Sequence, residues 1–115
     1  MLATLWGIEK TTALERNYFE LYYRVQEGLI GVITQSMRAI AIKVEKDTFV
    51  VDTIMAAEPG DLDKELIGEF TDHVTINIPW LTPGKVESKF LVSNSPLETL
   101  WDQTKTWVFM RYEAE

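Results

Sequence analysis

The sequence predicts an α+β domain in which two helices pack on one face of a four-stranded, mainly antiparallel sheet. Two segments repeat their apolar residues every three or four positions, four others are rich in β-branched and aromatic residues, and turn residues separate them. The expected order is α-β-β-α-β-β. The 115 residues suit one domain, residues 1–115, in which residues 1–10 form a loosely attached segment.

The first helix is expected over residues 12–30. Thr12 and Glu15 have the spacing of a capping box, in which two side chains satisfy backbone amides at the start of a helix. Gly31 is suited to end it. The apolar stripe of this helix is predicted to contain Leu14, Tyr18, Leu21, Tyr22, Val25 and Leu29.

A hairpin of two strands is expected next. Residues 38–44 alternate in character, with isoleucine and valine side chains on one face and small or charged side chains on the other. Residues 48–55 are rich in β-branched side chains. The polar residues 45–47 between the two segments predict the turn.

A second helix is expected from Asp61, which is placed to cap it, to about Val74. It follows the strand break at Glu58-Pro59-Gly60, and it must end before Ile78, because the residue before a proline is extended. Its apolar stripe is predicted to contain Leu62, Leu66, Ile67, Phe70 and Val74.

Two further strands, over residues 85–93 and 106–113, complete the predicted sheet, and residues 97–104 are expected to form a loop or one helical turn. The last strand carries apolar side chains on both faces, and such a strand needs cover on both faces. Two helices cover only one face. Loop residues, Trp6 or a second copy of the chain must therefore shield the other, which favours a homodimer or a partner surface.

Composition excludes several classes of function. The net charge of −7 and the pI of about 4.7 disfavour nucleic-acid binding and suit a basic protein partner. The absence of cysteine excludes disulfides, thiolate metal sites and cysteine nucleophiles. No apolar run is long enough for a membrane span, and residues 1–10 lack the basic region of a signal peptide, so we expect a cytoplasmic protein.

We expect neither a catalytic site nor a metal or cofactor. His73 is the one histidine, and no nucleophile is predicted to converge on it, so a structural role late in the second helix is favoured. Asp61, Asp63 and Glu65 alternate as at the start of a calcium loop, but Leu66 stands where such a loop needs glycine.

Two arginines and two glutamates are the candidate ligand or ion-pair residues. Arg38 is in phase with Ile40, hence directed toward the helices, and Arg111 lies within the apolar last strand. An arginine in such surroundings must pair or reach water. Glu65 and Glu69 of the second helix are expected to face the arginines in an internal ion pair, with an anion-binding site as the alternative.

Five aromatic residues are the candidate interface residues: Trp80, Trp101, Trp107, Phe109 and Tyr112. The first two are expected near turns, where a tryptophan either anchors an interface or covers a small core. The other three belong to the predicted last strand.

Three motifs together resemble a small, poorly characterised bacterial protein family. They are an Arg-Ala pair at Arg38, the turn Ala57-Glu58-Pro59 before an acidic helix, where the family usually has Gly-Glu-Pro, and the closing segment from Trp107 to Glu113. The resemblance covers roughly residues 14–113. In size and charge the chain is also similar to mobile-cassette products and to immunity proteins of toxin systems.

The sequence therefore predicts a non-enzymatic protein-binding module, of the immunity or mobile-cassette type, with a basic partner. Two alternatives stay open. The first is a domain that binds or modifies a small anionic molecule, with Arg38 or Arg111 in a pocket between sheet and helices. The second is a purely structural subunit of an assembly.

Overall fold

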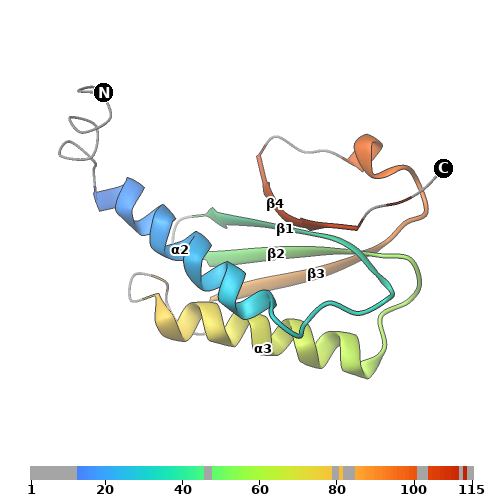
Figure 1. The fold of residues 1–115 in the computed structure, drawn as a ribbon, viewed down its shortest axis with the longest axis horizontal. Helices are drawn as coiled ribbons and strands as arrows, with labels where there is room; N and C mark the ends of the chain where they lie inside the picture. The colour runs from blue at the N-terminus through green and yellow to red at the C-terminus, as the bar shows by residue number, and fades with distance from the viewer. Residues whose placement is uncertain are drawn as a thin grey trace.

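A computed structural model describes residues 13–45, 48–78, 81, 85–100, 104–111 and 113, with side chains described from Phe19 onward. The elements are α2 (Ala13–Leu29), β1 (Met37–Glu45), β2 (Thr48–Met55), α3 (Asp61–Asn77), β3 (Val86–Val92), the 3-10 helix η1 (Leu97–Leu100) and β4 (Thr106–Met110) (Figure 1). The predicted class and element order are confirmed. Several predictions fall outside the described residues: those for residues 1–10, Thr12, the side chains of Leu14 and Tyr18, residues 46–47, Trp80, Trp101 and Tyr112.

The four strands form one mixed sheet in the order β3-β2-β1-β4. β1 pairs antiparallel with β2, as predicted for the hairpin, and also antiparallel with β4, whereas β2 and β3 run parallel. The parallel pair follows from the length of the helix between them. The 17 residues of α3 rise by roughly 25 Å, about the length of the eight residues of β2, so the chain returns to the end where β2 began.

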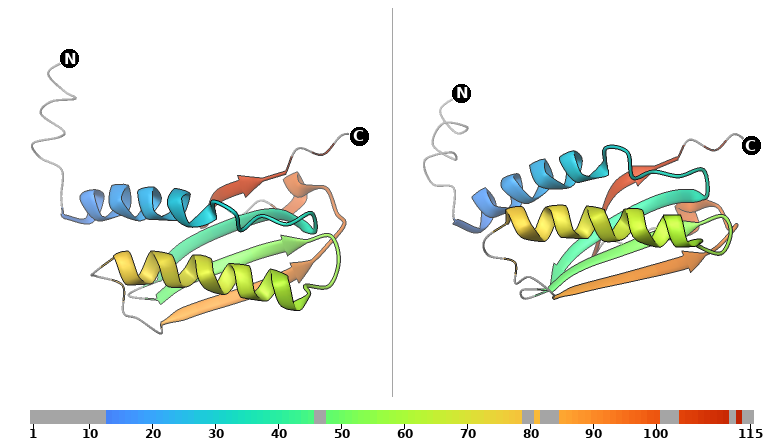
Figure 2. Two further views of the ribbon diagram at one scale, coloured as in Figure 1. Left: turned by 60° about the horizontal axis from the view of Figure 1, so that its bottom comes forward. Right: turned by 90° about the horizontal axis from the view of Figure 1, so that it is seen from below.

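Both helices lie on one face of the sheet, as predicted, and the main core lies between helices and sheet (Figure 2). The rings of Phe49 from β2 and Phe70 from α3 meet in this core with their centres 6.1 Å apart. Its other fully buried members include Leu21, Val25, Met37, Ile40, Ile42, Val51, Met55, Ile67 and Val74. Alternate residues of the strands and one stripe of each helix therefore meet in one apolar layer.

Both ends of α3 differ from the sequence prediction. The helix begins at Asp61 itself, so Gly60 is the capping position, and its N–H donates to Asp63 Oδ2 at 2.8 Å. The helix also continues to Asn77, past its predicted end. The proline constrains only Ile78, whose backbone is extended as expected, so the preceding residues remain free to be helical.

The face of the sheet opposite the helices is covered by the connection between β3 and β4. These strands are the two edges of the sheet, so the chain must cross it to pass from one to the other. Lys105 of the connection forms an ion pair with Asp52 of β2 on this face. The face also buries Ala39, Ala41, Val50 and Ile54. The sequence left three possible covers for this face, and the structure contains one of them, a loop. Cover by a second copy of the chain stays a prediction.

Gly28 lies at the contact between α2 and α3. A Cβ atom at this position meets Phe70 Cδ1 at 2.9 Å and His73 Cδ2 at 3.3 Å, and the Phe70 ring is fully buried. We expect Gly28→Ala to lower the free energy of unfolding. Overpacking costs about 1–3 kcal/mol, which outweighs the gain of up to about 1 kcal/mol from replacing a helical glycine by alanine.

Gly68→Ala is the matched control in α3, because a Cβ atom there meets nothing within 4 Å. This variant is expected to gain up to about 1 kcal/mol. Urea denaturation of both variants measures the difference. A Gly28→Ala chain that is stabilised as much as the Gly68→Ala chain contradicts the close helix contact.

Candidate functional site

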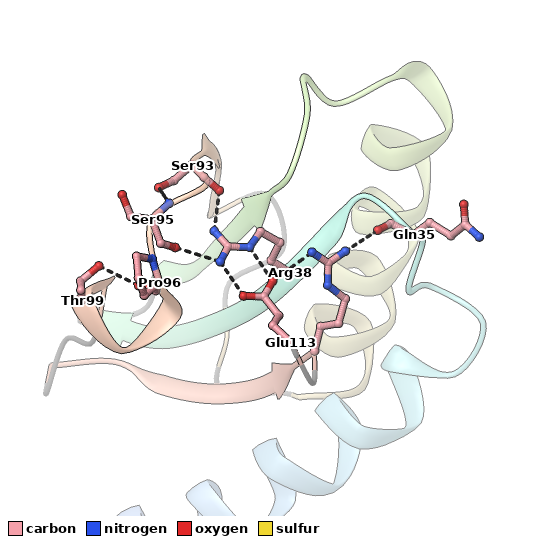
Figure 3. A network of polar contacts seen from close by, with 8 residues as sticks. Gln35, Arg38, Ser93, Ser95, Pro96, Thr99 and Glu113 are labelled. Carbon is pink, nitrogen blue, oxygen red and sulfur yellow. Dashed lines mark hydrogen bonds and ion pairs between the residues drawn. The ribbon is translucent and has the colours of Figure 1, made fainter. Parts of the chain in front are cut away.

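Arg38 is a buried residue at a bulge in β1, with 4% of its surface exposed. Met37 pairs with Met55 and Ala39 pairs with Ile54, which are consecutive residues of β2. Arg38 therefore has no partner on β2 and is the extra residue of the bulge. A bulge redirects the side chains beside it. Arg38 consequently points toward the segment after β3 instead of toward the helices (Figure 3), and its predicted orientation is wrong.

One carboxylate and two backbone carbonyl groups hold the guanidinium of Arg38 (Figure 3). Nε donates to Glu113 Oε2 at 2.7 Å, and Nη2 donates to Glu113 Oε1 at 2.6 Å, which makes a bidentate pair. Nη1 donates to the carbonyl of Ser93 at 2.5 Å, and Nη2 also donates to the carbonyl of Ser95 at 2.8 Å. Charge-assisted, bidentate pairs of this kind are among the strongest hydrogen bonds in proteins.

Arg111 extends the same network from the end of β4. Its backbone N–H donates to the carbonyl of Arg38 at 2.8 Å. Its guanidinium donates to the carbonyl of Gln35 at 2.8 Å and to Glu113 Oε2 at 2.9 Å. Glu113 therefore receives hydrogen bonds from both arginines.

The internal ion pair predicted between these arginines and α3 is wrong. Glu65 and Glu69 are exposed, on the side of α3 that faces away from the sheet, and Glu113 takes their place. The Arg38 side chain is 5% exposed and makes four hydrogen bonds to protein atoms. The network therefore fastens the ends of β1, β3 and β4 together, and Arg38 is enclosed by protein rather than open to an anionic ligand.

The hydrogen bonds from Arg38 lower the pKa of Glu113 from 4.5 to about 2. Since this pKa is lower in the folded than in the unfolded state, the carboxylate stabilises the fold fully above about pH 4.5, and this contribution is lost as the pH falls toward about 2.

We expect Glu113→Gln to melt below the wild type at neutral pH, with the two melting temperatures converging over this acid range. Thermal unfolding followed by circular dichroism measures both profiles, and a constant difference down to the lowest pH contradicts the assignment.

A cavity of about 370 Å³ lies under the β3–β4 connection. It is lined by Asp52, Ile54, Lys89, Phe90, Leu91, Leu100, Lys105 and Trp107. Its volume is within the range of small-ligand sites. Neither Arg38 nor Arg111 lines it, and it lies on the face of the sheet opposite the helices, so it is not the arginine-lined pocket that the sequence predicted.

Two of the five predicted interface residues lie in the described part of the chain. Trp107 is half-buried and lines the cavity under the connection, and Phe109 is half-buried against the main core. Both side chains thus have contacts within the chain. Their role in an interface stays a prediction.

The sides of α2 and α3 that face away from the sheet carry a second group of side chains. We call this surface the outer helical face and define it by Phe19, Tyr23, Ile30, Leu62, Glu65, Glu69, Asp72 and Ile76, of which Ile30 directly follows α2. Its five apolar side chains are between 60% and 83% exposed. The three carboxylates lie along α3 between Leu62 and Ile76, so the face mixes large apolar groups with negative charge.

Contacts between the two helices hold this face together. Arg24 Nη1 donates to Glu27 Oε1 at 2.9 Å, and His73 Nε2 of α3 lies 3.2 Å from the same oxygen. The hydrogen bond from Arg24, and then that from His73, lowers the pKa of Glu27. The two halves of the outer helical face therefore belong to one helical layer (Figure 2).

Sequence reasoning did not identify this face. Leu62 was predicted to be buried but is 61% exposed, because it lies on the far side of α3 from Ile67 and Val74. The available signal was the spacing of three and four residues from Leu62 through the acids to Ile76. That signal is weak, because leucine is otherwise typical of a buried stripe.

Among the described ranges, no three or more histidine, aspartate or glutamate side chains are placed to hold a metal ion. Asp61, Asp63 and Glu65 lie in the first turns of α3. In the same part of the chain, no helix has both the length and the apolar character needed to cross a membrane.

Comparison with known proteins identifies a family for this chain. The MafI2 immunity protein family matches residues 19–113, a range that includes most of α2, the whole of α3 and all four strands. No curated protein matches the sequence. The matched range contains the Arg38 network and the outer helical face, which agrees with the resemblance noted from the motifs around Arg38 and Arg111. Because the match spans most of the sequence and its folded elements, this chain belongs to the MafI2 immunity protein family.

Proposed function

We propose that the chain neutralises a basic protein toxin by binding it on the outer helical face, without catalysing a reaction. The observation that carries the proposal is the combination on this face of exposed apolar side chains and carboxylates. Membership of an immunity protein family supports a role in binding a partner protein. The other face of the sheet is occupied by the β3–β4 connection, which favours the helical side for contact.

The apolar side chains of this face supply contact area. Single exposed apolar residues are normal on a protein surface, whereas here five lie on the same side of one helical layer. Phe19 and Tyr23 are aromatic, and tyrosine in particular is frequent among the residues that dominate binding energy. Such side chains gain free energy when a partner removes them from water.

The carboxylates of α3 define the charge of the partner. Glu65, Glu69 and Asp72 are all exposed between apolar neighbours, and the whole chain carries a net charge of −7. A surface of this kind accelerates association with a basic protein and repels acidic ones. A cationic toxin domain is the partner that fits this surface best.

The test uses the purified chain and a purified basic toxin domain, which is sought among the products of the flanking genes. We expect the chain to abolish the toxin's activity at equimolar ratio, and we expect calorimetry to show affinity that falls as salt rises, because exposed charges are screened. A toxin that retains its activity in an excess of the chain refutes the proposal.

A further inference from the structure

The sheet has two edges, and they differ in how well they are protected. β4 has five residues, and its register with β1 is interrupted at Val108, between Trp107 and Phe109. Short edge strands and bulges both discourage pairing with another chain. β3 has seven residues in unbroken register with β2, and within the described residues it pairs with β2 alone. β3 is therefore the edge that is open to a further strand.

The direction of the free backbone groups on β3 follows from two hydrogen bonds. The carbonyl of Lys85 accepts from Phe49 N–H at 3.0 Å, and Ser93 N–H donates to the carbonyl of Met55 at 3.0 Å. Backbone groups alternate in direction along a strand, so the odd-numbered residues of β3 face β2. The N–H and C=O groups of Val86, Ser88 and Phe90 consequently point away from the sheet.

We propose that β3 pairs with β3 of a second copy of the chain, antiparallel and centred on Ser88. In this arrangement Ser88 exchanges hydrogen bonds with Ser88 of the second copy, and Val86 exchanges them with Phe90. The two-fold axis stands perpendicular to the sheet. The outward backbone groups identified above are then all paired.

The side chains of β3 favour the register centred on Ser88 over the neighbouring register centred on Lys89. Pairing centred on Ser88 sets Glu87 of each copy opposite Lys89 of the other, in pairs that share no backbone hydrogen bonds and therefore bring side chains closest. Pairing centred on Lys89 sets Lys89 against its own copy, which is destabilising. All three residues from Glu87 to Lys89 are exposed, so the ion pairs form without rearrangement of the core.

The resulting dimer has a continuous sheet of eight strands. The perpendicular axis keeps the helices of both copies on the same side, so two outer helical faces point in the same direction. This inference is independent of the proposed function, since β3 contributes no residue to the outer helical face. Dimerisation and toxin binding are measured separately.

Sedimentation velocity of the full chain tests the dimer at concentrations up to about 200 µM, because mass action favours the dimer as concentration rises. We expect Lys89→Glu and Glu87→Lys each to raise the dissociation constant about 10-fold or more, because each replaces two attractive pairs by two repulsive ones. The double variant, Glu87→Lys with Lys89→Glu, is expected to restore dimerisation. The single variants shift the net charge in opposite directions, which separates pairing from overall repulsion.

Ser88→Pro gives a second, backbone-based test. Proline removes one N–H that points outward and leaves the hydrogen bonds between β2 and β3 intact, so it is expected to yield a folded monomer. Circular dichroism checks the fold of every variant. A wild-type chain that is monomeric at about 200 µM overturns the proposal, since mass action has then failed to populate the dimer. A Lys89→Glu chain that dimerises as tightly as the wild type also overturns it.

Discussion

Arg38→Ala is expected to lower the free energy of unfolding by about 3–5 kcal/mol, the usual cost of removing one partner of a buried ion pair. The Arg38 side chain is 5% exposed, and its truncation removes two of the three hydrogen bonds that Glu113 accepts from the arginines. It also leaves the backbone carbonyl groups of Ser93 and Ser95 without this donor. In a domain of this size the melting temperature should fall by roughly 10 °C or more. Urea denaturation followed by circular dichroism measures the free-energy change directly.

Arg111→Ala is the control for this prediction. Arg111 bonds the same carboxylate but its side chain is 38% exposed, so its loss is expected to cost about 1 kcal/mol. Arg38→Lys separates charge from geometry, because lysine keeps the charge but lacks the planar fork that reaches Glu113 and the carbonyl groups together. If Arg38→Ala costs no more than Arg111→Ala, the network does not hold the strand ends together.

Reversal of the three carboxylates of the outer helical face is expected to weaken toxin binding by about 100-fold or more. Each of Glu65→Lys, Glu69→Lys and Asp72→Lys replaces an attraction by a repulsion, at about 1 kcal/mol per position, and about 1.4 kcal/mol corresponds to a factor of ten. Most of the loss should appear in the association rate, because exposed charges act mainly by steering. Surface plasmon resonance separates the association and dissociation rates.

A second triple variant changes the net charge equally at sites away from this face. Glu45, Glu58 and Glu98 are exposed and belong to the end of β1, the turn before α3 and η1. Their reversal to lysine is expected to leave binding within about 5-fold of the wild type, apart from a weaker long-range effect that salt screens. Equal losses in both triple variants would mean that net charge alone attracts the toxin, and the assignment to the outer helical face would then fail.

Much of the fold is predictable because apolar periodicity is a local property. The alternation in β1 and β2 and the spacing in α2 and α3 identify these elements to within a few residues. Strand neighbours are not local. β2 and β3 pair in parallel because α3 carries the chain back to the end of the sheet where β2 begins. The similar lengths of β2 and α3 explain this return once the structure is known.

The candidate site was less predictable, for a different physical reason. Arg38 and Arg111 were identified as residues that need partners, but the bulge at Arg38 reverses the direction that strict alternation assigns to it. Because of this one extra residue, Arg38 pairs with Glu113 and not with the expected glutamates of α3. A bulge depends on the pairing of two strands, so the sequence of β1 by itself does not reveal it.

The strand order has a consequence for how the chain folds during translation. The central strands β1 and β2 emerge from the ribosome first, whereas both flanking strands are made later. Arg38 has its carboxylate partner only once a residue 75 positions further along the chain has been synthesised. Until then the nascent hairpin has two unpaired edge strands, and unpaired edge strands readily pair with other chains and aggregate. Rapid completion of synthesis should therefore favour a high yield of folded protein.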